Sequence, residues 1–117
     1  MKKILTIVAL ALSLVGYCNE PDKVAVAYIE AMSKGNIDMA IGHVCQKNKP
    51  QVKAMSAIPG VKEQLIREGA GTTFKAVKTK KHGKYATVRI KSIKGKIVKT
   101  ADFRLVKEGG VWKIELN

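Results

Sequence analysis

Residues 86–116 read ATVRIKSIKGKIVKTADFRLVKEGGVWKIEL and carry the clearest structural signal of the chain. Apolar and polar side chains alternate there in three runs, and a period of two is typical of an antiparallel strand that buries one face. The apolar positions are Ala86, Val88 and Ile90, then Ala101, Phe103 and Leu105, then Trp112, Ile114 and Leu116. These side chains are predicted to face inward, with Arg89, Lys91, Asp102 and Arg104 on the outer face.

Glycine-containing turns separate the predicted strands. They occur at His82-Gly83, Lys94-Gly95 and Gly109-Gly110, and short turns of this kind join strands into hairpins. A further strand over residues 74–79, and a long third strand that begins near Lys96, complete a four-stranded meander.

Residues before this sheet are predicted to be helical, since their apolar residues recur every three or four positions. A first helix ends at Lys34-Gly35, a second begins near Asn36, and a third covers residues 61–67, while Pro50 and Pro59 are interpreted as interruptions. The inward positions are Val24, Ala27, Tyr28 and Ala31 in the first helix, Ile37, Ala40, Ile41 and Val44 in the second, and Val61 and Leu65 in the third. Helices followed by strands indicate an α+β fold, in which the N-terminal helices pack on the concave face of a curved, antiparallel four-stranded sheet.

The N-terminus is typical of an export signal. Lys2 and Lys3 precede an apolar run over residues 4–15, and a basic start followed by about 7–15 apolar residues characterises a secretory signal peptide. The run is shorter than the roughly 20 apolar residues that a membrane-spanning helix needs. We therefore expect residues 1–17 to be a signal peptide and residues 18–117 to be a single domain, in the periplasm or on the outer surface.

Residues 14–18, LVGYC, resemble the lipobox of bacterial lipoproteins, in which the peptidase cuts before a cysteine that carries the lipid. Tyr17 departs from the small residue usual at its position. A competing cut follows residues 11–13, Ala-Leu-Ser, whose small outer residues suit the ordinary signal peptidase. We expect a lipid on Cys18, which leaves Cys45 as a lone, buried thiol, whereas without the lipid the two cysteines can form one disulfide.

Positive charge is concentrated in the predicted sheet. The chain has 22 Lys and Arg residues against 9 Asp and Glu residues, a net charge of +13. Residues 18–70 hold seven basic and six acidic side chains, whereas residues 71–117 hold thirteen and three. A basic face attracts anions through its summed field. The excess of lysine over arginine, nineteen to three, favours diffuse attraction over specific phosphate recognition.

The partners that this charge predicts are an anionic envelope surface or an acidic protein, contacted through Arg89, Lys91 and Arg104, in addition to the membrane reached through the lipid anchor. Nucleic acid is not expected, because the chain has too few aromatic residues for a stacking platform. The alternative interpretation is that the lysines keep the protein soluble and protect the sheet edges from pairing.

The sequence does not indicate catalysis. The inward sheet positions contain no acid or base, and Asp102, on the outer face, is predicted to pair with a cation on a neighbouring strand. His82 lies in a lysine-rich turn, and His43 is more typical of helix packing than of a tuned acid or base. Two cysteines and two separated histidines give no metal-ligand spacing. We therefore predict no catalytic residue, no metal site and no cofactor.

Three segments carry a resemblance to a known fold: the opening helix over residues 21–31, Gly35-Asn36 before a helix that contains Ala40, and residues 105–114 with their Gly-Gly turn and Trp-Lys-Ile. Their order resembles the cone-shaped α+β fold of the nuclear transport factor 2-like, or cystatin-like, superfamily. More narrowly, it is similar to small bacterial lipoproteins of unknown function, some of which are labelled lumazine-binding-like. The resemblance implies the fold, an envelope location and a pocket between helices and sheet, in which enzymes of this fold place Asp, His or Tyr.

The resulting expectation is an exported, lipid-anchored, non-enzymatic binding module that uses an apolar pocket, the basic sheet face, or both. Two alternatives remain open. One is a small isomerase- or hydrolase-like enzyme that uses the pocket with His43 or Tyr28. The other is an immunity or inhibitor protein that neutralises an acidic partner.

Overall fold

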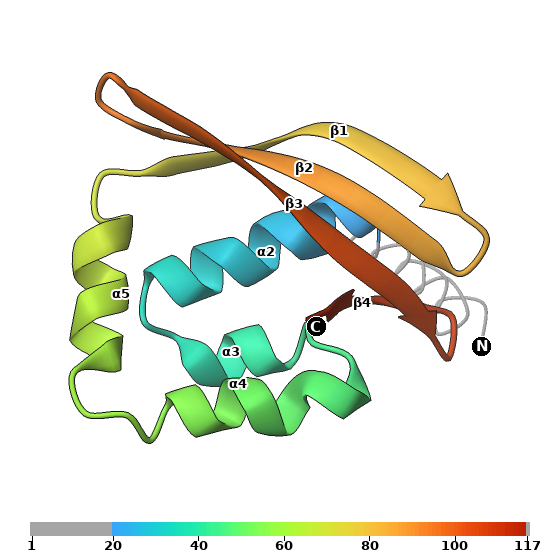
Figure 1. Ribbon diagram of the computed structural model, residues 1–117, viewed down its shortest axis with the longest axis horizontal. Coiled ribbons are helices and arrows are strands. Elements are labelled where there is room, and N and C mark those ends of the chain that lie inside the picture. The colour runs from blue at the N-terminus through green and yellow to red at the C-terminus, as the bar shows by residue number, and fades with distance from the viewer. Residues whose placement is uncertain (1–19, 117) are drawn as a thin grey trace, which may run out of the picture.

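The computed structural model describes residues 20–116 (Figure 1). The expected signal peptide, residues 1–17, and the expected lipid site, Cys18, lie outside these residues. The helices are α2 (Pro21–Ser33), α3 (Ile37–Ile41), α4 (Lys49–Met55) and α5 (Val61–Gly69), with a 3-10 turn at Gln46–Asn48. The strands are β1 (Thr73–His82), β2 (Tyr85–Lys94), β3 (Ile97–Glu108) and β4 (Val111–Glu115). Among the residues described, no helix has the length and apolar character required to cross a membrane.

The four strands form one antiparallel sheet in the order β1-β2-β3-β4, so the predicted meander is confirmed. Val88 lies opposite Phe103, and Leu105 lies opposite Ile114, which places the predicted inward side chains on one face. The glycines of the three hairpin turns have positive φ angles, which other residues adopt only with strain: Gly83, Gly95, Gly109 and Gly110.

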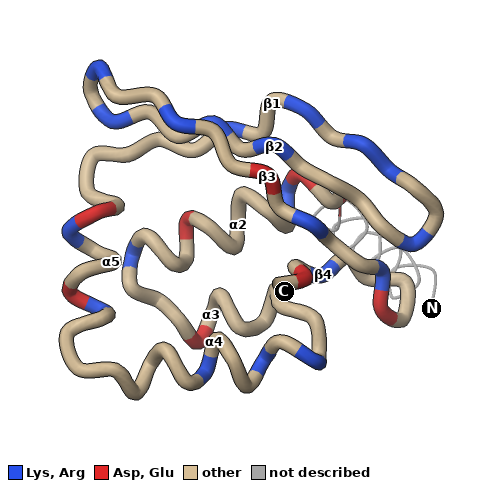
Figure 2. The backbone as a smooth tube through the Cα atoms, viewed as in Figure 1, with Lys and Arg blue, Asp and Glu red and all other residues tan. Residues whose placement is uncertain are grey.

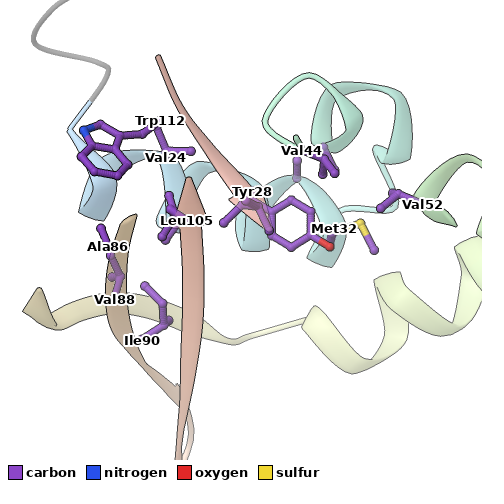
Figure 3. Close-up of a cluster of buried hydrophobic side chains, with 14 of the residues drawn as sticks. Val24, Tyr28, Met32, Val44, Val52, Ala86, Val88, Ile90, Leu105 and Trp112 are labelled. Carbon is purple, nitrogen blue, oxygen red and sulfur yellow. The ribbon is translucent and has the colours of Figure 1, made fainter. Parts of the chain in front are cut away.

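The hydrophobic core lies between α2 and the concave face of the sheet and continues to α3 and α4, which lie on the far side of α2 (Figure 1). Tyr28 of α2 packs edge-on against Phe103, with ring centroids 6.1 Å apart, and Leu105 and Val88 lie beside it in the same cluster (Figure 3). Trp112 is only 6% exposed, as its inward phase predicts. The predicted α+β fold, with helices on the concave face of a four-stranded sheet, is confirmed.

Two details of the helices differ from the prediction. Residues 49–55 form α4, because Pro50 occupies the first turn, where a helix has no partner for the backbone N–H that proline lacks. In α2, Ala25 is fully buried, whereas Ala27, the residue predicted to face inward, is half-buried.

The segment after α3 also differs, since the helix ends at Ile41 and does not reach Val44. Val44 instead forms a parallel bridge with Ile114 of β4. Ile114 donates its N–H to the carbonyl of His43 at 2.7 Å, and Cys45 donates its N–H to the carbonyl of Ile114 at 2.8 Å. The loop between α3 and α4 is therefore tied to the last strand.

Cys45 is completely buried, as predicted. Its thiol donates a hydrogen bond to Oδ1 of Asn48 at 2.9 Å, and the same oxygen accepts the backbone N–H of Leu116 at 2.9 Å. Cys45 is thus a structural residue that helps to hold the chain after β4 against the helical layer.

Candidate functional site

A cleft of about 560 Å³ opens on the concave side of the sheet, between α2, α5 and the β2–β3 hairpin. Its apolar bed consists of Ile29 and Met32 from α2, Leu65 from α5, Phe74 from β1 and Ile97 from β3. Hydroxyl groups are contributed by Ser33, Thr72 and Ser92. The cleft therefore offers a mainly apolar surface with a few hydrogen-bonding groups.

The cleft forms because the concave face of the sheet extends beyond the helix that covers it. The inward side chains of β2 change from apolar residues at Val88 and Ile90 to polar ones at Ser92 and Lys94, near the β2–β3 turn. Ala101 of β3 lies opposite Ile90 and keeps the predicted inward phase, yet it is exposed. The alternation of the sequence predicts which side chains face inward, but not where the helical cover ends.

Gly69 allows α5 to approach α2 closely enough to form one wall of the cleft. A Cβ atom at this position would lie 2.5 Å from the Cβ of Ser33 and 2.6 Å from its carbonyl oxygen. Such distances are shorter than real contacts, so a larger residue would push the two helices apart. The pattern of apolar residues does not predict this packing role, because Ser33 lies far from Gly69 along the chain.

The mouth of the cleft carries two lysines from the β2–β3 hairpin, Lys94 and Lys99. Lys94 donates hydrogen bonds from Nζ to the carbonyl oxygens of Arg67 and Glu68, at 3.4 and 3.3 Å, and so caps the C-terminal end of α5. The ammonium group of Lys99 makes no ion pair with any residue from 20 to 116. The only acid that lines the cleft is Glu68, whose Oε1 accepts a hydrogen bond from Gln64 at 3.2 Å.

The titratable residues named as candidates for catalysis, Tyr28 and His43, do not line this cleft. Tyr28 is part of the core, and burial raises the pKa of its hydroxyl above the ordinary value. Burial, with Lys113 and Lys49 nearby, lowers the pKa of His43, which keeps its ring neutral at pH 7. His82 lies exposed at the end of β1.

The described residues contain no group of three His, Cys, Asp or Glu side chains that could hold a metal ion. The cleft lining thus combines an apolar bed with three hydroxyl groups, one carboxylate and two lysines, so it can contact an apolar molecule beside a positive charge.

Arg89, Lys91 and Arg104, the residues predicted to bind an anionic surface, share the outer face of the sheet as expected. Arg89 is paired with Asp102, Nε to Oδ1 at 2.9 Å and Nη2 to Oδ2 at 3.4 Å, which confirms the predicted cross-strand pair. This hydrogen-bonded pair raises the pKa of Arg89 and lowers that of Asp102.

Arg104 is paired with Glu115, Nε to Oε1 at 2.9 Å, and its guanidinium lies 4.5 Å from the ring centroid of Tyr85. The register places an acid opposite each arginine, so both arginines already have an acidic partner. Lys91 has no ion pair within residues 20–116. Binding of an anionic surface through these three residues stays a prediction.

No model of a known protein family and no curated protein sequence matches the chain. Several solved structures do. One is a Campylobacter jejuni protein described as a candidate NTF2-like transpeptidase, with a TM-score of 0.64 at 12% identity over 84% of this chain and 99% of the other.

A Rhodopseudomonas palustris protein that contains a SEC-C motif has a TM-score of 0.55 at 10% identity, over 85% of this chain and 77% of the other. An NTF2-like protein of unknown function from Shewanella oneidensis has a TM-score of 0.52 at 18% identity, over 79% and 88%. At such identities the similarity concerns the fold alone. This chain therefore has the nuclear transport factor 2-like fold, with its cleft between the helices and the concave sheet.

Proposed function

We propose that the chain is an exported, lipid-anchored binding module of the cell envelope, without catalytic activity, whose cleft holds an apolar molecule that carries an anionic group. The observation that supports this most directly is the cleft itself, about 560 Å³ in volume with five apolar side chains and two lysines at its mouth. Its size lies within the range of about 300–1,000 Å³ that ligand-binding pockets occupy.

The charges at the cleft favour an anionic group on the ligand. The ammonium group of Lys94 is engaged by carbonyl oxygens of α5, whereas Lys99 has no ion pair within the described residues and is available to a carboxylate or phosphate. Phe74 is the one aromatic side chain in the lining. A single ring gives little stacking surface for a flat heteroaromatic such as lumazine, so we favour an aliphatic body.

A binding role is favoured over catalysis because general acid–base chemistry needs a positioned group whose pKa suits the reaction. The one carboxylate of the cleft, Glu68, is exposed to solvent and accepts a hydrogen bond from Gln64. A transpeptidase also needs an activated nucleophile. The three hydroxyl groups of the cleft, those of Ser33, Thr72 and Ser92, each donate a hydrogen bond to a backbone carbonyl oxygen and not to a general base. The proposed export and lipid anchor rest on residues 1–18 of the sequence and on the resemblance described above.

Binding of three twelve-carbon probes to the unlipidated Cys18→Ser protein tests the ligand class. Dodecanoate should bind and shift the NMR resonances of Leu65, Phe74 and Ile97, while dodecanol binds more weakly and dodecylamine least. Lys99→Ala should weaken dodecanoate binding by about tenfold, because a charge-assisted hydrogen bond contributes about 1.5–3 kcal/mol.

The matched control is Lys96→Ala, which removes the same charge from the turn of the same hairpin without altering the cleft lining. Its affinity for dodecanoate should stay within about twofold of the parent protein. Equal affinities for dodecanoate and dodecylamine, or shifts that map outside the cleft, would contradict the proposed ligand.

A further inference from the structure

The β1–β2 hairpin concentrates positive charge at one end of the molecule. Residues 78–84 read KTKKHGK, with lysines at four of seven positions and no acid. Lys78, Lys80, Lys81 and Lys84 are all exposed, and Figure 2 shows basic residues following this hairpin to its turn. We call these four lysines the basic hairpin.

The start of the described chain is fixed beside the basic hairpin. The carboxylate of Glu20 accepts a hydrogen bond from Nζ of Lys81 at 3.4 Å, and the next residue, Pro21, is buried as the first residue of α2. Cys18 precedes Glu20 by two residues, which span at most about 7 Å of extended chain. A lipid on Cys18 would therefore be attached no more than about 7 Å of chain from Glu20, the residue that contacts the hairpin.

From this arrangement we propose that the basic hairpin rests on the anionic phospholipid headgroups next to the anchor and sets the orientation of the domain on the membrane. The orientation rests on the lipid anchor of the proposed function, while the affinity of the hairpin for anionic lipid does not. Lysines near an anionic bilayer contribute about 1 kcal/mol each, and a short tether keeps them within the screening length of about 8 Å at physiological salt.

The acidic residues near the β1–β2 turn do not neutralise the lysines of the basic hairpin. Glu20 is paired with Lys81, Glu108 accepts the backbone N–H of Gln46 at 3.2 Å, and Asp22 lies in the first turn of α2. Lys78, Lys80 and Lys84 make no ion pair with any residue from 20 to 116. Lys78 lies near enough to Asp102 to help lower the pKa of that carboxyl, and Lys84 lies 5.4 Å from the ring centroid of Tyr85, but neither contact neutralises a lysine within an ion pair. By contrast, both arginines of the outer sheet face already have acidic partners. The hairpin lysines are therefore more available to a lipid phosphate than the arginines predicted from the sequence.

The proposed orientation places the cleft at the end of the molecule that faces away from the membrane. β2 is ten residues long, which corresponds to roughly 30 Å, and it runs from the β1–β2 turn to Lys94 at the mouth of the cleft (Figure 1). The hairpin would thus hold the binding cleft above the headgroups and open to molecules in the surrounding space.

Vesicle binding by the unlipidated Cys18→Ser protein tests the hairpin separately from the anchor. The protein should co-sediment with vesicles that contain phosphatidylglycerol at low salt, bind pure phosphatidylcholine vesicles at least tenfold more weakly, and dissociate at 1 M salt, where the screening length falls to about 3 Å. The variant with Lys78→Gln, Lys80→Gln and Lys84→Gln should bind phosphatidylglycerol vesicles at least about tenfold more weakly than its parent.

The matched control carries Lys53→Gln, Lys62→Gln and Lys96→Gln, which remove the same net charge from exposed positions on α4, α5 and the β2–β3 turn. Its binding should stay within about threefold of the parent. If both triple variants lose binding equally, the attraction belongs to the net charge and the hairpin proposal is overturned. Stronger binding to an acidic protein or to lipopolysaccharide than to phosphatidylglycerol would also overturn it.

Hydrogen exchange of the lipidated protein on phosphatidylglycerol vesicles tests the orientation. Amides of residues 78–86 should exchange more slowly on the membrane than in detergent micelles, while those of residues 92–99 should be unchanged. Protection of residues 92–99 instead would overturn the orientation. If the mature protein carries no lipid on Cys18, the anchor of the proposed function fails, but the vesicle assay still decides whether the hairpin binds anionic lipid.

Discussion

Trp112 fills the space between β4 and α2, on the inward phase of its strand and 6% exposed. Its ring also lies 5.4 Å from the ammonium group of Lys107. Trp112→Ala should lower the free energy of unfolding by about 3–5 kcal/mol, as large aromatic truncations in cores do. Urea denaturation measures this loss, with Val98→Ala, at a side chain that is 52% exposed, as the control that should change stability by less than about 0.5 kcal/mol. A denaturation midpoint equal to that of the parent protein would contradict the core position of Trp112.

Gly69 is the residue through which packing and the cleft are coupled. Gly69→Ala should lower the free energy of unfolding by about 1–3 kcal/mol, because the added methyl group overlaps Ser33. The same variant should also weaken dodecanoate binding, since α5 must move. Gly42→Ala is the comparison, because its nearest neighbour, the carbonyl oxygen of Met39, would lie 3.3 Å from the new Cβ and needs only a small shift. Equal losses of stability in the two variants would argue against the close contact.

His43 should make the stability of the protein depend on pH. Its folded-state pKa lies below the ordinary value of 6.5, so the unfolded chain binds the proton more readily. Stability from this residue is therefore fully present above about pH 6.5 and decreases as the pH falls through the lower, folded-state pKa. Denaturation midpoints of the parent and of His43→Gln, compared at pH 8 and pH 5, should show a smaller decrease in the variant. An identical decrease in both would exclude His43 as a source of the acid sensitivity.

Across the outer face of the sheet, two arginine–carboxylate pairs differ in burial. The side chains of Arg89 and Asp102 are both about half exposed, at 48% and 50%, whereas Glu115, the partner of Arg104, is 9% exposed. Arg89→Ala should therefore have little effect on stability, because solvent screens an exposed ion pair. Arg104→Ala should lower it by about 1–3 kcal/mol, because it removes one of two cations from a nearly buried carboxylate, leaving Lys47. Denaturation midpoints measure both losses, and equal losses of stability would show that the burial of Glu115 does not strengthen its ion pair with Arg104.

Local patterns were enough to predict the strands and the first helix, because alternation and turn glycines depend only on neighbouring residues. They failed at Pro50, where the same residue that interrupts a helix can also begin one. They failed again at Val44, since a bridge to Ile114 depends on a partner far along the chain. The short elements between α2 and α5 are therefore the part of the fold that a single sequence predicts least well.

The cleft was only partly predictable for the same reason. The sequence predicts which side chains of β2 and β3 face inward, and the resemblance implies a pocket. How much of the concave face the helices cover depends on the contact between Gly69 and Ser33. The ion pairs of Arg89 and Arg104 depend on the register between strands, which places Asp102 and Glu115 directly opposite them. A count of charges along the sequence does not show which side chains lie opposite each other, so it cannot tell which cations have an acidic partner.

For the whole molecule, the most direct test concerns the proposed anchor. The mature protein from its native host should begin at Cys18, carry the mass of a lipid and sediment with the membrane fraction. Cys18→Ser should release it into the soluble fraction, whereas Cys45→Ser, at the other cysteine, should not. A mature, unmodified protein that begins at Leu14 would contradict the anchor and favour the competing cut after Ser13.

The bridge between Val44 and Ile114 also affects how the chain folds. It joins residues seventy positions apart, and the same strand supplies Trp112 to the core. Long-range contacts of this kind form late, because the entropy of closing a long loop is lost before the contacts are gained. A growing chain cannot complete its core before residue 114 has been added, so shorter lengths lack the contacts of Trp112 and Ile114. For a protein that we propose is exported, such late completion of the core would favour the extended form that a translocation channel accepts.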